Sequence, residues 1–166
     1  IIATALATIL GTLAALGLSR PHMPYKGLIM AILISPMIVP LIITAAGMFF
    51  FYARINLVYT FTGVILAHVA LATPFVVITV TATLVGFDMN MVKAAQSLGA
   101  KPMRTFFKVI MPLILPGIIS GALFAFITSF DEVVVVMFMA SLDQLTIPKQ
   151  MWAGIRQEIS PVILCM

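Results

Sequence analysis

The feature that most constrains this chain is a series of apolar runs that are long enough to cross a lipid bilayer. About 20 predominantly apolar residues suffice for a helix to span the hydrocarbon core. Four such runs can be read from the sequence, at residues 1–18, 27–52, 57–87 and about 112–140. Because lipid offers no hydrogen-bond partners, the backbone groups of each run must be satisfied internally, which predicts helices.

Charged side chains are too few for a water-soluble fold. They make up 8% of the 166 residues, against about 25% in soluble domains. We therefore expect an all-α, polytopic transmembrane helical bundle with about four complete spans. The formal net charge is +4, but the basic residues lie in the gaps between the apolar runs. That distribution is typical of membrane topology, so we expect lipid and no nucleic acid as a partner.

Both ends of the sequence lie within apolar runs, "IIATALATIL" and "SPVILCM". We expect residues 1–166 to form a single, partial transmembrane domain whose first and last helices are missing or truncated. The single cysteine, Cys165, excludes an internal disulfide and is expected to be a buried or lipid-facing thiol.

The charges between the runs predict an orientation. The connector at 19–26 carries two Lys or Arg residues, the connector at 53–56 carries one, and the segment at 88–108 carries four. Positive charge in short loops marks the cytoplasmic side. The first and third connectors are therefore expected inside, and the loop at 141–160 outside, where Trp152 is expected to anchor the interface.

Two of the runs contain features that affect their shape. The run at 27–52 contains Pro36 and Pro40, and its length favours one kinked span. His68 is the only ionisable side chain in the third run. It is expected to hydrogen-bond across a helix interface, with a role in a solute pathway as the alternative. Pro74 is expected to kink the same helix.

The basic segment, "KAAQSLGAKPMRTFFKVIMPLILPGI" at 93–118, has the signals of two short helices. Asp88 can cap the first helix, Gly99 can end it in a left-handed conformation, and Pro102 suits the first turn of the second. The second helix has an apolar face and a basic face, and the prolines at 112 and 116 are expected to end or kink it. From periodicity alone, an interfacial pair on anionic lipid and a docking site for a partner protein are equally well supported.

At these residues the chain resembles the signature cytoplasmic loop of type I ABC importer permeases. The pattern is Glu-Ala-Ala, three residues, Gly, then a longer gap to Leu-Pro. Ala94, Ala95, Gly99 and Pro112 match, whereas Lys93 replaces the Glu and a Met precedes the proline. The resemblance implies a permease domain whose coupling helices, at about 88–112, sit in a groove of a separate ATPase. The docking candidates are Lys93, Ala94, Ala95, Gly99, Ala100 and Arg104.

These 166 residues contain no GxxxxGK[ST] phosphate-binding loop and no spacing of catalytic or metal-ligating residues. The chain is therefore not expected to be an enzyme or to hold a cofactor, and ATP and Mg are expected on the partner ATPase. The resemblance implies a second permease subunit, ATP-binding subunits and an extracytoplasmic solute-binding protein as partners. It also implies the bacterial cytoplasmic (inner) membrane as the location.

The acidic pair Asp131–Glu132 lies between two apolar stretches. If its helix starts near Pro116, Asp131 lies about 22 Å along the axis, beyond the midplane but within the hydrocarbon. A carboxylate there should face a water-filled path or a partner. A helix starting nearer Ile110 would instead put the pair at the outer headgroups. Another alternative is an ion pair with a basic residue of the second permease.

The element "SFDE", followed by "TIPKQMWAGIRQEISP", is similar to permeases of the spermidine/putrescine import group. The resemblance implies a cationic cargo, whose ammonium groups an acidic pair in a cavity could attract. An importer of the same fold for sulfate, molybdate or iron is an alternative. Another is a secondary transporter driven by an ion gradient, with Asp131 or Glu132 as its proton site.

Overall fold

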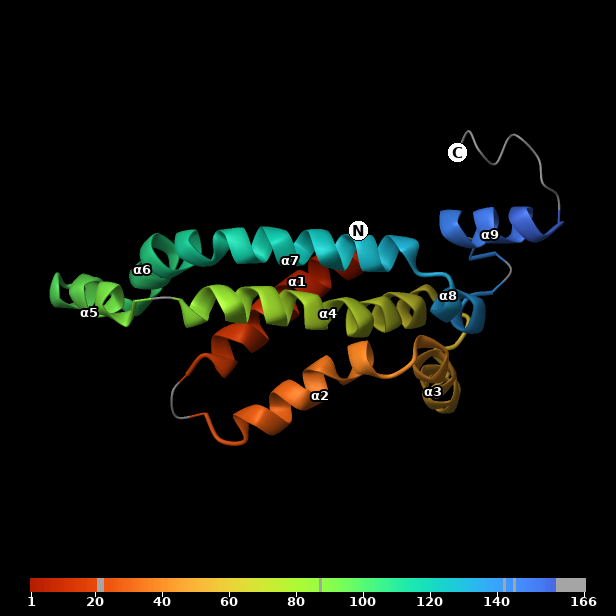
Figure 1. The fold of residues 1–166 in the computed structure, drawn as a ribbon, viewed down its shortest axis with the longest axis horizontal. Coiled ribbons are helices and arrows are strands. Elements are labelled where there is room, and N and C mark those ends of the chain that lie inside the picture. The colour runs from red at the N-terminus through yellow and green to blue at the C-terminus, as the bar shows by residue number, and fades with distance from the viewer. Residues whose placement is uncertain (21–22, 87, 142, 145, 158–166) are drawn as a thin grey trace.

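The computed structural model describes residues 1–157 apart from 21, 22, 87, 142 and 145, and its regular elements over these residues are all helical. Figure 1 shows their arrangement. The helices, in chain order, are α1 (Ile2–Leu18), α2 (Lys26–Ile38), α3 (Leu41–Arg54), α4 (Phe61–Val85), α5 (Met89–Ser97), α6 (Pro102–Thr105), a π-helical turn (Phe106–Ile110), α7 (Met111–Asp131), α8 (Val134–Met139) and α9 (Ile147–Gln157). The prediction of an all-α transmembrane fold is confirmed.

The core of the bundle is the contact among α1, α4 and α7 (Figure 1). Val76 of α4 is fully buried at its centre. Gly11 of α1 and Gly121 of α7 both face it, and a Cβ added to Gly11 would lie 2.6 Å from the Val76 Cβ. A Cβ on Gly121 would lie 2.9 Å from the Val76 Cα. Small residues here allow the helix backbones to approach closely, which is the main source of packing energy between helices in lipid.

The four apolar runs do not become four equivalent spans. Helix α4 and the continuous helical stretch Pro102–Asp131 are each long and apolar enough to cross a membrane. Helix α4 keeps Pro74 within its 25 residues. Helix α1 has 17 residues, about 25 Å at 1.5 Å per residue. Helices α2 and α3 count as a third crossing only if the two are taken as one broken span.

The run at 27–52 does not have the predicted kink but a sharp break between two helices. Helices α2 and α3 meet at 107°, far more than a proline kink. The break lies at Val39 and Pro40, both in extended conformations, with ψ of 136° and 130°. A residue before proline is driven out of the helical region, and Pro40 has no N–H to continue the α2 ladder. Pro36, by contrast, lies inside α2 without ending it.

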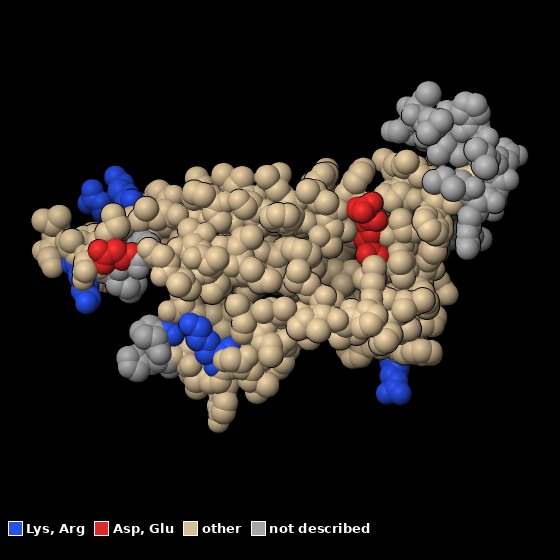
Figure 2. All heavy atoms as spheres, in the orientation of Figure 1, with Lys and Arg blue, Asp and Glu red and all other residues tan. Residues whose placement is uncertain are grey.

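The two connectors expected on the cytoplasmic side lie at the same end of the bundle. In Figure 1 the α1–α2 connector and helices α5 and α6 are at one end, whereas α3, α8 and α9 are at the other. Figure 2 shows Lys and Arg side chains gathered at the α5–α6 end and an acidic patch near the opposite end. This arrangement agrees with the predicted orientation, and it separates two candidate functional regions by the length of the bundle.

Candidate functional site

The basic hairpin, residues 88–110, has the local structure that its sequence predicts. The Asn90 N–H donates to the Asp88 carboxylate at 2.9 Å and so caps α5. Gly99 has φ +78°, a left-handed conformation that costs glycine little. Lys101 is extended and Pro102 opens α6. The tight turn between the two helices is therefore set by a few residues whose backbone preferences agree.

The second hairpin helix does not end at Pro112 or Pro116, so of the two predicted effects of these prolines, ending the helix is wrong. The chain stays helical from Pro102 to Asp131. The turn before Pro112 is π-helical, which widens the helix where the proline ring would collide with the carbonyl four residues back. As a result, the hairpin runs directly into α7, and any displacement of it acts on the start of that helix, at the end of the bundle opposite the acidic pair.

The predicted docking residues are accessible to different degrees. Lys93, Ala94, Gly99 and Arg104 are exposed, and Ala95 and Ala100 are half-buried. Leu98 is 89% exposed and Met103 is 69% exposed, so apolar side chains are accessible on the same hairpin. An exposed surface of mixed basic and apolar character suits a protein groove or a lipid surface. The docking role of these residues therefore stays a prediction.

The acidic pair lies where α7 ends, not inside a longer span. Asp131 is the last residue of α7, Glu132 is extended with ψ of 115°, and α8 is a separate short helix. Helix α7 itself begins at Met111, which places Asp131 about 30 Å along the axis at 1.5 Å per residue. The expected depth of about 22 Å is therefore wrong, because the helix starts near Ile110. The pair lies at the outer end of the apolar span.

Although adjacent in the chain, the two carboxylates have different surroundings. Asp131 is exposed, whereas Glu132 is 8% exposed. The Val135 N–H donates to Glu132 Oε1 at 2.8 Å, which caps the first turn of α8. Val135 and Met139 of α8 are fully buried in a cluster with side chains of α3 and α4, among them Ala45 and Leu71. Glu132 thus connects the end of α7 to a packed corner of the bundle.

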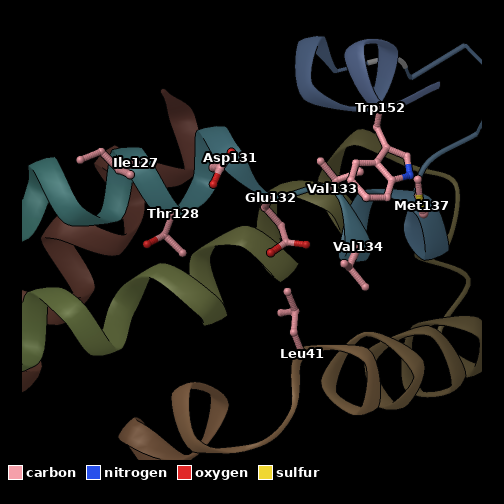
Figure 3. Close-up of a pocket in the computed structure, with 9 residues that line it drawn as sticks. All are labelled: Leu41, Ile127, Thr128, Asp131, Glu132, Val133, Val134, Met137 and Trp152. Carbon is pink, nitrogen blue, oxygen red and sulfur yellow. The ribbon is translucent and has the colours of Figure 1, made fainter. Parts of the chain in front are cut away.

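Both carboxylates line a cavity of about 590 Å³, shown in Figure 3. Its lining residues are Leu41, Ile127, Thr128, Asp131, Glu132, Val133, Val134, Met137 and Trp152. A second cavity of about 410 Å³ shares Leu41, Thr128 and Glu132 with the first and extends along the α2–α3 break to Leu71 and Phe75. The break therefore has a consequence for the site, because it forms one wall of a space that adjoins the acidic cavity.

Sequence reasoning missed Leu41 and Thr128 as lining residues. Thr128 lies three and four residues before the acidic pair, so helical spacing could have placed it on the same side of α7. Nothing local could have found Leu41, because its position depends on the sharp angle between α2 and α3. Trp152, expected as an interface anchor, lines the cavity from α9 (Figure 3). Cys165 lies outside the described residues.

His68 is buried, and its Nδ1 lies 3.0 Å from Ser129 Oγ on α7. The expected hydrogen bond across a helix interface is confirmed. The bond joins α4 to α7 two residues before Asp131, so it helps to fix how the acidic end of α7 is presented to the cavity.

Comparison with known proteins adds an independent line of support. Residues 7–166 match the family described as "Binding-protein-dependent transport system inner membrane component". The chain is 32% identical over 161 residues to the spermidine/putrescine transport system permease protein PotC of Haemophilus influenzae, which covers 97% of this chain and 63% of that protein. It is 30% identical over 165 residues to the putrescine transport system permease protein PotI of Escherichia coli (strain K12), covering 95% and 58%.

A relative named for a different cargo also matches. The trehalose transport system permease protein SugB of Mycobacterium tuberculosis (strain CDC 1551 / Oshkosh) is 29% identical over 141 residues, covering 85% of this chain and 52% of that protein. The chain spans about three fifths of the length of the polyamine permeases named above.

These matches cover nearly the whole chain, and the resemblance inferred from the hairpin and from "SFDE" is confirmed. The apolar helices indicate a multi-pass membrane protein, and the family is one of transport components and not of enzymes. The chain belongs to the binding-protein-dependent transport system inner membrane components, the type I permeases of multi-subunit ABC importers, and within them it resembles the polyamine group.

Proposed function

We propose that the chain is part of a permease that forms the translocation path for a small cationic solute, a polyamine such as spermidine or putrescine. The observation that carries the proposal is the acidic cavity at the outer end of α7, with Asp131 exposed and Glu132 buried on its wall. A polyamine carries several ammonium groups. A carboxylate on the wall of a largely apolar cavity raises the local concentration of such cations.

The polyamines named for PotC and PotI support a polyamine cargo, whereas SugB, a trehalose permease, shows that members of this family carry different cargoes. A carboxylate beside the route repels an anion such as sulfate and attracts a cation. The exposed carboxylate of Asp131 on the cavity wall therefore favours a positively charged cargo over an anionic one.

We further propose that the basic hairpin docks into a separate ATPase subunit, with Lys93, Ala94, Ala95, Gly99, Ala100 and Arg104 as the contacts. ATP and Mg are bound there and not by this chain. A second permease subunit completes the path, and an extracytoplasmic solute-binding protein delivers the cargo. Because α6 continues into α7, displacement of the hairpin by ATP-driven closure moves the helix that carries the acidic pair.

The test is solute uptake in a strain that lacks its own polyamine importers and expresses the full-length permease with its partner subunits. Labelled spermidine, putrescine and sulfate are compared. We expect saturable uptake of one or both polyamines, lost when Asp131→Asn and Glu132→Gln are combined while the complex still assembles. Asp143→Asn is the matched control, because Asp143 is an exposed carboxylate of the outer loop that lines neither of the two cavities.

Uptake of sulfate without uptake of either polyamine would overturn the proposed cargo. Normal polyamine uptake by the double variant would remove the acidic pair from the path. An equal loss in the Asp143→Asn control would show that general surface charge matters, and not the carboxylates of the cavity.

A further inference from the structure

The acidic pair contains two carboxylates that line the same cavity but differ in burial, backbone conformation and hydrogen bonding. Asp131 ends a long helix and is exposed on the larger cavity only. Glu132 follows it in an extended conformation, is 8% exposed, and lines both cavities. In Figure 3 the two side chains leave the chain in different directions, with Glu132 directed toward Leu41 at the start of α3.

The hydrogen bond from the Val135 N–H to Glu132 Oε1 joins the residue that follows α7 to the first turn of α8. The turn between α7 and α8, which this hydrogen bond holds, is also linked to the loop before α4. The Tyr59 N–H donates to the Met139 carbonyl, at the end of α8, at 2.9 Å. Gln144 Nε2 donates to the Tyr59 carbonyl at 3.1 Å. A chain of contacts thus runs from Glu132 through α8 to the loop before α4.

Tyr59 shows that this corner is under strong structural control. Its φ is +61°, a region in which a bulky side chain is a genuine outlier. The cost of such a conformation is of order 1–3 kcal/mol and is tolerated only where the surroundings fix it. The Tyr59 N–H bonds to the end of α8, and its carbonyl bonds to Gln144 in the loop after α8. Helix α8 and the loop that follows it therefore both help to hold Tyr59 in this conformation.

We infer that the two carboxylates have separate roles. Asp131 supplies the charge that meets the ammonium groups of the cargo. Glu132 is a positioning residue, which holds the α7–α8 corner and, with Leu41 and Thr128, the wall shared by the two cavities. This inference rests on the proposed function for its first half, and on the geometry of the corner for its second.

The physical basis is the different property that each position requires. An exposed carboxylate beside a cavity acts through its charge, which Glu retains and Asn does not. A buried cap acts through its acceptor oxygen, which Gln retains. A side chain without an acceptor leaves the Val135 N–H buried and unpaired, and such a group carries its full desolvation cost. We therefore expect uptake to depend on the negative charge at position 131 and on the hydrogen-bond acceptor at position 132.

A crossed set of variants in the full-length permease, assembled with its partner subunits, separates these requirements. Initial rates of spermidine uptake are measured for Asp131→Asn, Asp131→Glu, Glu132→Gln and Glu132→Met. We expect a fall of about tenfold for Asp131→Asn and Glu132→Met, the scale of one lost charge-assisted or buried hydrogen bond. We expect Asp131→Glu and Glu132→Gln to stay within about threefold of the wild type, since each keeps the required property.

Amide hydrogen exchange in residues 133–140 provides the readout that uptake alone does not. Exchange there should be faster in Glu132→Met by about tenfold, because the capped turn opens more often, and should keep its wild-type rate in both variants at Asp131. If Glu132→Gln transports as poorly as Asp131→Asn while exchange stays slow, Glu132 meets the cargo by its charge and the division of roles is wrong. Wild-type exchange in Glu132→Met also overturns it.

Failure of the proposed function would give a different result in the uptake measurements. If neither Asp131→Asn nor Glu132→Gln changes uptake, the acidic path is wrong. The positioning role of Glu132 is still decided by the exchange rate of Glu132→Met.

Discussion

The structures of the two ends of the bundle are determined by different kinds of interaction. The basic hairpin is organised by local signals, since a capping aspartate, a left-handed glycine and a first-turn proline each act within a few residues. The acidic end depends on contacts between distant parts of the chain. Its cavity takes residues from the start of α3, the end of α7, α8 and α9. The hairpin can therefore tolerate changes that preserve its backbone, whereas the acidic end is sensitive to changes in several helices.

A change at Gly99 should have the largest effect, because it alters the hairpin turn itself. A β-branched residue at φ +78° is strained, by about 1–2 kcal/mol, and a reshaped turn no longer presents the proposed docking residues together. We expect Gly99→Val to lower ATP-dependent uptake about tenfold or more. The measurement compares uptake with ATP hydrolysis by the assembled complex, and hydrolysis should continue without transport.

Gly99→Asn is the matched control, because Asn accepts the left-handed region more readily than other side chains. A Cβ at this position meets no heavy atom of the described residues within 4 Å, so steric bulk is not the cause of any loss. We expect the Asn variant to keep most of its coupled uptake. Coupled uptake at the wild-type level in Gly99→Val would contradict the docking role of the turn.

The hairpin can be predicted from the sequence because its structure depends on the backbone preferences of a few residues. Asp88, Gly99 and Pro102 have backbone preferences that no distant contact overrides. The sequence does not predict the structure at Pro40, where the chain breaks sharply, or at Glu132, where α7 has already ended. A proline in an apolar run can kink a span, as we expected, or break it, and the choice depends on whether another part of the protein fills the corner. Here α8 packs beside α3, with Val135 and Met139 fully buried.

The predicted start of the fourth span is wrong for a related reason. Pro112 and Pro116 look like helix boundaries, but a π-helical turn accommodates the first and the second lies inside α7. Moving the helix start from Pro116 to Met111 moves Asp131 several ångströms further along the helix axis, at 1.5 Å per residue. Periodicity indicates that a helix exists, but its end depends on backbone adjustments that have no sequence pattern of their own.

The packing of α7 against α4 connects the two ends, and Gly121 tests it. A Cβ there would lie 2.5 Å from Thr79 Oγ1 and 2.9 Å from the Val76 backbone. Gly121→Ala should lower the stability of the permease by about 1–3 kcal/mol through overpacking, despite the better helix propensity of alanine. The measurement is thermal unfolding of the purified complex in detergent, which should occur at a lower temperature.

Gly47 offers the matched control within α3. A Cβ added there has open space around it, so Gly47→Ala should leave the stability unchanged or raise it by up to about 1 kcal/mol. Equal behaviour of the two alanine variants would mean that α7 can move away from α4 at little cost. In that case α7 could not carry a displacement from the hairpin to the acidic end.

The smallest expected effect is at the hydrogen bond between His68 and Ser129, which ties the acidic end of α7 to α4. Polar contacts between helices in a membrane contribute about 0.6 kcal/mol on average, because each group also finds hydrogen-bond partners in the unfolded state within the membrane. A double-mutant cycle of His68→Ala and Ser129→Ala should give a coupling energy of that size in the unfolding free energy. A coupling near zero would show that the bond adds nothing to the interface. A coupling of several kcal/mol would mean that this one contact fixes the acidic end as firmly as local signals fix the hairpin turn. That result would contradict the view that the acidic end depends on many distant contacts.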